Sequence, residues 1–169
     1  MQKITRLAFL PVLMTGLMAG LLTGCGESPP TQAVTDTPSL EPATSSSRDF
    51  GNYVLHFNAI RTDTLTPEIA KLYNIVRSAN RAMLNVSMIK KATGTPGVPV
   101  AGNVTAMAVN LNGQFKDLTL REIREGEAIY YIGDVLVADD ETLVFTVNAT
   151  PADESSLYSV RFQRGFFGR

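Results

Sequence analysis

Apolar and polar residues alternate along several segments of this chain, and this alternation most constrains how the chain can fold. In residues 53–59, Leu55 and Phe57 fall on one face, whereas His56 and Asn58 fall on the other. A period of two residues is typical of a β-strand with one buried face. The pattern predicts strands in seven segments, which are residues 53–59, 82–88, 102–110, 117–125, 128–135, 143–147 and 158–163.

Residues that favour turns separate several of these segments. Asn112-Gly113 lies between two strand patterns and is the strongest short hairpin signal in the chain. Glu125-Gly126 is expected to close the next hairpin. Within residues 117–125, the apolar positions change phase between Leu120 and Ile123, which predicts a β-bulge between them.

The predicted fold is all-β: an immunoglobulin-like two-sheet β-sandwich of about seven strands with one short helix. Residues 49–169 contain no second linker, and their number suits a single domain with its own core. The chain has no Trp and only one Cys, so the hallmarks of antibody domains are absent. The prediction therefore concerns architecture and leaves topology open, with a small β-barrel as the alternative.

The short helix is expected to begin at Thr66-Pro67-Glu68. Thr66 suits the N-cap, Pro67 suits the first helical position, and an acidic residue there lies near the positive end of the helix dipole. An apolar stripe follows, which we expect to cover an open end of the sandwich, and it consists of Ile69, Leu72 and Tyr73.

The N-terminus has the order of a bacterial export signal. Lys3 and Arg6 precede an apolar stretch at residues 7–22, and the segment ends in Leu-Thr-Gly-Cys25. This ending resembles the lipobox of bacterial lipoproteins, which implies removal of residues 1–24 and attachment of palmitate-type fatty acyl chains to Cys25. Ordinary secretion is an alternative, whereas a transmembrane helix is disfavoured because the stretch is short and interrupted by Pro and Gly.

The residues after the cleavage point indicate where the protein would be anchored. Gly26 follows Cys25, where an Asp would retain some lipoproteins in the inner membrane, so we expect the outer membrane, facing the periplasm. Residues 25–48 are rich in Pro, Ser and Thr, and they predict a lipidated N-terminus followed by a flexible tether. Lipidation of the single cysteine would leave the domain without an internal disulfide.

The charge of the chain argues against nucleic acid as a partner. Loss of Lys3 and Arg6 would leave 13 basic residues against 16 acidic ones, a net charge of −3. Nucleic-acid binding needs clustered Lys and Arg that displace counterions, and the sequence has no such cluster. The expected partners are the membrane, through the lipid anchor, and an envelope protein.

Few residues are candidates for catalysis or metal binding. His56 is the only histidine and falls on an outward strand face, which suits a surface residue better than a catalytic triad. Copper binding by His56 and Met83, with Met88 and Met107, is an alternative, although methionine in strands more often fills a core. The sequence predicts no catalytic residue, no resident metal and no cofactor.

The densest charged segment is residues 121–127. Its structural interpretation is a solvated strand end and hairpin with weak ion pairs. Its functional interpretation is a binding patch in which arginines grip a partner's carboxylates. The patch would consist of Arg121, Glu122, Arg124, Glu125 and Glu127.

Several motifs resemble a bacterial family defined by a domain of unknown function, number 4426. They include Phe57-Asn-Ala59, Leu65-Thr-Pro-Glu-Ile-Ala70, Leu84-Asn-Val-Ser87 and Leu120-Arg-Glu-Ile-Arg-Glu-Gly-Glu-Ala-Ile-Tyr-Tyr131. The resemblance covers the folded part and implies a small exported domain without a known activity.

We expect a non-enzymatic, membrane-tethered binding or assembly module in the periplasm. A small-ligand or copper-binding lipoprotein is the alternative.

Overall fold

The structure is a computed structural model, and it describes residues 37–168. The predicted signal peptide at residues 1–24, the predicted lipid attachment site Cys25 and the first part of the predicted tether lie outside the described residues. Among the residues that are described, no helix is both long and apolar enough to cross a bilayer.

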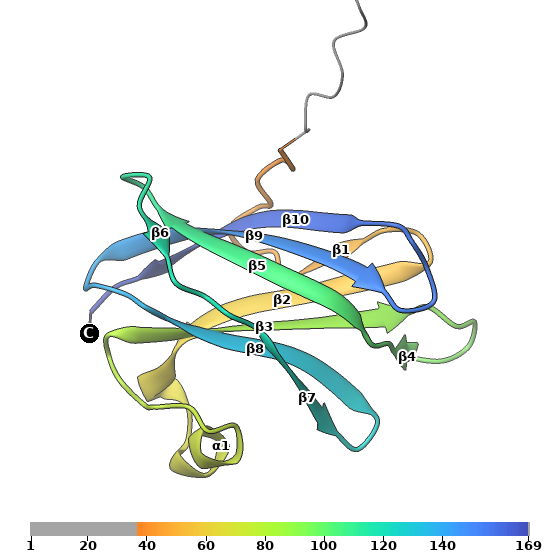
Figure 1. Ribbon diagram of the computed structural model, residues 1–169, viewed down its shortest axis with the longest axis horizontal. Coiled ribbons are helices and arrows are strands. Elements are labelled where there is room, and N and C mark those ends of the chain that lie inside the picture. Colours follow the sequence, from red (N-terminus) through yellow and green to blue (C-terminus); the bar gives the residue numbers. More distant parts are fainter. Residues whose placement is uncertain (1–36, 169) are drawn as a thin grey trace, which may run out of the picture. The chain divides into compact units, whose positions relative to one another are not determined.

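Two antiparallel sheets face each other, as the alternation predicted (Figure 1). The six-stranded sheet has the order β1-β2-β3-β8-β7, and β4 pairs with β3. Its strands are β1 (Ser47–Asp49), β2 (Tyr53–Arg61), β3 (Arg81–Lys90), β4 (Val98–Pro99), β7 (Arg121–Glu125) and β8 (Ala128–Leu136). The four-stranded sheet has the order β10-β9-β5-β6. Its strands are β5 (Gly102–Asn110), β6 (Phe115–Lys116), β9 (Glu141–Pro151) and β10 (Tyr158–Phe166).

The predicted β-sandwich is confirmed. Each of the seven predicted segments contains a strand, and the additional strands β1, β4 and β6 have only two or three residues each. Both predicted hairpins are present, since Asn112-Gly113 joins β5 to β6 and Gly126 follows β7 with a φ of 57°.

The main core lies between the two sheets. The Phe162 ring lies 4.6 Å from Phe57 of the opposite sheet and 5.2 Å from Phe145 of its own sheet, measured between ring centroids. All three side chains are almost completely buried. Burial of large apolar side chains is therefore the principal stabilising contribution.

A second, smaller core lies on the outer face of the six-stranded sheet, under helix α1 (Pro67–Leu72) (Figure 1). The N-cap prediction holds, because the Thr66 hydroxyl accepts a hydrogen bond from the Ile69 amide at 3.3 Å. A 3₁₀ turn (Thr62–Thr64) precedes the helix. The buried members of this helix-covered cluster are Leu65, Ala70, Ile75, Met83 and Ile132.

The predicted apolar stripe of the helix holds only for Tyr73, which packs against the helix-covered cluster. Ile69 and Leu72 are 38% and 62% exposed, whereas Ala70 is buried. The helix lies over strands β3 and β8 rather than over an open end of the sandwich, and it turns its smallest side chain toward them. A small residue at the contact lets a helix approach a sheet closely.

The predicted bulge at residues 121–122 is also absent. The pairing of β7 with β8 runs without interruption from Arg121, opposite Ile132, to Glu125, opposite Ala128. The apolar phase changes because the chain crosses between the sheets, from β6 to β7. Leu118 and Leu120 pack against the main core, whereas Ile123 packs against the helix-covered cluster.

The predicted tether is shorter than expected at its C-terminal end. The Glu41 amide donates a hydrogen bond to the Arg161 carbonyl at 2.7 Å, and the Arg164 guanidinium donates to the Ser45 carbonyl at 2.9 Å. Strand β1 then pairs with β2. Residues 40–48 are thus attached to the domain, and Leu40 and Glu41 pair with Arg161 on the otherwise free edge of β10.

Candidate functional site

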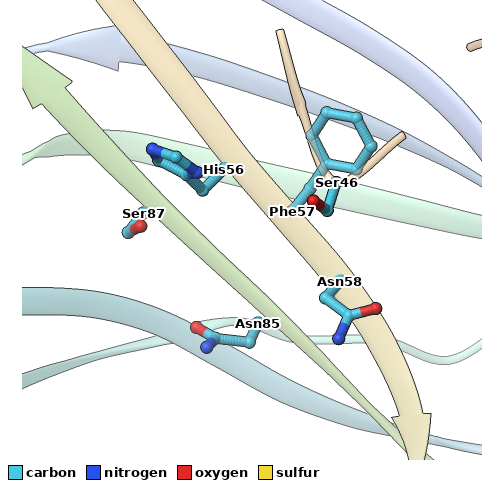
Figure 2. A pocket seen from close by; sticks show the side chains of 6 residues that line it. All are labelled: Ser46, His56, Phe57, Asn58, Asn85 and Ser87. Atoms are coloured by element: carbon cyan, nitrogen blue, oxygen red, sulfur yellow. The ribbon is translucent and has the colours of Figure 1, made fainter. Parts of the chain in front are cut away.

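A polar hollow opens on the outer face of the six-stranded sheet (Figure 2). Its volume is about 190 Å³. Most of the lining comes from strands β2 and β3, and Ser46 adds a third side just before β1. The lining residues are Ser46, His56, Phe57, Asn58, Asn85 and Ser87.

Strand register brings the polar side chains of the hollow together. His56 lies opposite Ser87, and Asn58 lies opposite Asn85, so that four polar side chains form two cross-strand pairs on one face (Figure 2). Directly opposite residues of an antiparallel pair have Cβ atoms about 5 Å apart. The alternation that buries Leu55 and the other inward residues therefore also sets the hollow on the opposite face.

The rim of the hollow is fixed by the backbone. The Phe57 amide donates a hydrogen bond to the Ser46 carbonyl at 2.8 Å, which holds the segment before β1 against β2. The Phe57 side chain is 1% exposed and packs in the main core, so this residue presents its backbone to the hollow. The side chains available to a ligand are hydroxyls, carboxamides and one imidazole.

Asn85 carries an unsatisfied group in this hollow. Its carboxamide oxygen is buried, and no group within residues 37–168 donates a hydrogen bond to it. A buried acceptor without a donor costs about 1–3 kcal/mol relative to a satisfied one. A ligand that donates a hydrogen bond to this oxygen would recover that free energy.

The predicted binding patch does not form one surface, because strand β7 directs its residues to both faces of the sheet. Arg121 and Glu125 lie on the face covered by helix α1 and bracket Tyr73. The Arg121 guanidinium donates to the Tyr73 carbonyl, and the Tyr73 hydroxyl donates to Glu125 at 2.7 Å. That carboxylate, together with partial burial, raises the pKa of Tyr73 to about 12.

Glu122 and Arg124 lie on the opposite face of β7. Glu122 accepts hydrogen bonds from the Tyr131 hydroxyl at 2.8 Å and from the Arg124 guanidinium at 2.7 Å. These bonds, the one from Tyr131 foremost, lower the pKa of Glu122. Burial raises the pKa of Tyr131, whose hydroxyl also accepts a hydrogen bond from the Gly102 amide at 2.8 Å.

Glu127, the fifth residue of the predicted patch, is exposed in the turn between β7 and β8. The other four charged side chains of this patch bond to groups of the domain itself. The segment thus ties the β7 edge to Tyr73, which follows helix α1, and to Tyr131.

The residues of the copper alternative are not brought together. Met83 lies four positions along β3 from Ser87, the partner of His56, which separates them by about 13 Å at the usual rise of a strand. Met83 is buried in the helix-covered cluster, Met88 is buried in the main core, and Met107 is on the other sheet. Within residues 37–168, no three His, Cys, Asp or Glu side chains converge on a possible metal position.

Sequence reasoning identified His56 but missed the hollow around it. The signal was present in the outward positions of β2 and β3. Two consecutive outward positions on each strand carry polar side chains, whereas the neighbouring outward positions carry Val54, Ile60, Met83 and Ile89. Only the register, which no local pattern supplies, shows that the polar positions coincide.

The two antiparallel sheets place the protein among β-sandwich domains, and comparison with known proteins identifies the family. The family model named "Domain of unknown function (DUF4426)" matches residues 47–168, so the chain belongs to the DUF4426 family. This confirms the resemblance seen in the sequence.

Solved structures agree with this assignment. A DUF4426 family protein from Pseudomonas aeruginosa PAO1 is 28% identical, with a TM-score of 0.61, and the match covers 73% of this chain and 94% of that one. A family 123 glycoside hydrolase from Clostridium perfringens is 11% identical with a TM-score of 0.32, over 66% of this chain and 27% of that one, and this weak likeness carries no argument. No curated protein matches the chain.

Proposed function

We propose that the protein is a lipid-anchored, non-enzymatic binding module of the bacterial cell envelope, attached through Cys25 and facing the periplasm from the outer membrane. The N-terminal motif that ends in Leu-Thr-Gly-Cys25 supports the anchor. The segment before residue 40, which is rich in Pro, Thr and Ser, supports a tether that lets the domain reach partners at a distance from the membrane.

One observation carries the binding role: the unsatisfied carboxamide oxygen of Asn85 in the polar hollow. Buried polar groups in stable domains normally have partners, and exceptions often coincide with function. The chemistry of the lining supports recognition rather than catalysis. His56 is accompanied there by hydroxyls and carboxamides, whereas a hydrolytic triad also needs a carboxylate to orient its histidine.

In-cell photocrosslinking tests this proposal. A photoreactive residue is introduced at Asn58, which is exposed at the hollow, or at Asn103, which is exposed on strand β5 of the other sheet. We expect a specific product, with a protein or an envelope polymer, from position 58 only. If both positions give the same products, the hollow is not the binding surface and the proposal fails.

The anchor is tested separately. Incorporation of labelled palmitate should require Cys25, and a Cys25→Ala variant should leave the membrane fraction and lose the crosslinked product. A Cys25→Ala variant that stays in the membrane fraction would contradict the anchor. A product retained after Cys25→Ala would show binding that does not depend on anchoring.

A further inference from the structure

We infer that the polar hollow binds an uncharged sugar unit of a glycan. This inference rests on the proposed function as a binding module and adds the chemical class of the ligand. It follows from the chemistry of the lining, from the size of the hollow and from the position of the hollow on the sheet.

The lining offers hydrogen bonds of both kinds and no formal charge when His56 is neutral. Each Asn carboxamide provides an acceptor oxygen and two donor hydrogens, each Ser hydroxyl provides both functions, and a neutral imidazole provides one of each. Phosphate and carboxylate ligands instead require cationic side chains or several hydrogen-bond donors that converge on the anion. Sugar hydroxyls, which both donate and accept, match this mixed lining, and the Asn85 oxygen is an acceptor to which such a hydroxyl can donate.

The size of the hollow indicates a single unit of a longer chain. At about 190 Å³, the hollow is smaller than the pockets of about 300–1,000 Å³ that enclose whole drug-sized ligands. Its position on an outer sheet face lets a polymer continue beyond the bound unit (Figure 2). The lining also disfavours lipids and aromatic ligands, because its one apolar side chain, Phe57, is turned into the main core.

The position of the hollow disfavours an extended peptide. A peptide that binds by strand addition needs a free strand edge. At His56, strand β2 is paired on both sides, with Ser47 of β1 and with Ser87 of β3. Strand β1 begins at Ser47, opposite His56, so Asn58 is paired only with Asn85 of β3. Around His56, recognition must therefore use side chains, which suits the separate hydroxyl groups of a sugar.

The test is a titration of the full lipidated chain in detergent, followed by the side-chain amide signals of Asn58 and Asn85 in NMR spectra. The probes are the uncharged oligosaccharides chitotriose and cellotriose, with inorganic phosphate and trialanine as comparators. We expect an oligosaccharide to shift both amide signals. Asn85→Ala should weaken binding about tenfold, in line with the loss of one buried hydrogen bond.

Asn58→Ala provides a second variant at an exposed position, in case Asn85→Ala alters folding, and it should also weaken binding. Asn103→Ala is the matched control on the other sheet and should leave the affinity unchanged. The inference is overturned if neither oligosaccharide shifts the two signals at millimolar concentration, or if phosphate or trialanine shifts them more. A crosslinked product from position 58 without sugar binding would overturn this inference and leave the proposed function standing.

Discussion

The outer face of the six-stranded sheet contains two neighbouring regions that differ in burial and in polarity. In the helix-covered cluster, Met83 and Ile132 are buried beneath helix α1. In the polar hollow, His56 and Asn58 are exposed on the same face. The boundary is sharp, because Asn85 of the hollow lies directly opposite Ile132 of the cluster.

The difference shows how one sheet face serves both stability and recognition. Where the face is covered, apolar side chains contribute to folding, and the helix provides the second layer that a single sheet face lacks. Where the face is open, polar side chains avoid the exposed apolar patch that would otherwise invite aggregation. They also retain hydrogen-bonding capacity for a ligand, at the cost of an unsatisfied group at Asn85.

The largest expected effect is on the covered side. Ile132→Ala should lower the free energy of unfolding by about 2–4 kcal/mol, because it removes a fully buried side chain and leaves a cavity under the helix. Urea denaturation followed by circular dichroism measures this change. Leu136→Ala on the same strand is the control, and since Leu136 is 61% exposed, its effect should stay within about 0.5 kcal/mol. Equal losses from the two variants would contradict a buried second core.

A smaller effect is expected from the start of the helix. Thr66→Ala removes the hydroxyl that accepts from the Ile69 amide and should lower the free energy of unfolding by about 1 kcal/mol. Amide hydrogen exchange should accelerate at Ile69 and Ala70 and remain unchanged at Ser87 in the hollow. Thr66→Ser retains the acceptor, so it should restore most of the loss. A Ser variant as unstable as the Ala variant would show that the cap is not the cause.

Tyr73 connects the helix side to strand β7, and its removal should have an effect of similar or smaller size. Tyr73→Phe deletes the hydrogen bond to Glu125 and should lower the free energy of unfolding by about 0.5–1.5 kcal/mol at neutral pH. Because folding raises the pKa of Tyr73 from 10.0 to about 12, its stabilising contribution is complete below pH 10 and is lost as the pH rises through about 12.

The pH dependence sharpens this prediction. The stability difference between the wild-type protein and Tyr73→Phe should shrink between pH 10 and pH 12, and the near-ultraviolet absorbance of tyrosinate should lack one late-titrating group in the variant. A difference that stays constant to pH 12 would mean that the Tyr73 hydroxyl does not bond to Glu125.

The comparison also shows which features could be predicted from the sequence. Alternation located the strands, and Thr66-Pro67 located the start of the helix, because both signals arise from interactions between residues close in the chain. The fate of Met83 could not be predicted in this way. Met83 faces away from the main core, and only the packing of a separate helix buries it.

The remaining features could not be predicted, because they depend on strand register and on which sheet each strand joins. The change of apolar phase between Leu120 and Ile123 would be explained equally well by a bulge or by a change of sheet, and a local pattern cannot distinguish the two. The prediction of one patch at residues 121–127 depends on the adjacency of its members in the sequence. A strand sends adjacent residues to opposite faces, and that geometry divides the run between Tyr73 and Tyr131.

The smallest effect on stability is expected in the polar hollow. Asn85→Ala removes a carboxamide whose buried oxygen has no donor within residues 37–168, so the free energy of unfolding should not fall by more than about 0.5 kcal/mol. Thr62→Val is the informative contrast, since the buried Thr62 hydroxyl donates to the Val76 carbonyl at 2.8 Å and accepts from the Ser78 amide at 3.0 Å. That variant should lose about 1–3 kcal/mol, because it leaves both partners unsatisfied. Urea denaturation of the two variants measures both changes in the free energy of unfolding. If Asn85→Ala lowers it as much as Thr62→Val does, Asn85 stabilises the fold. The polarity of the hollow would then need no ligand to explain it.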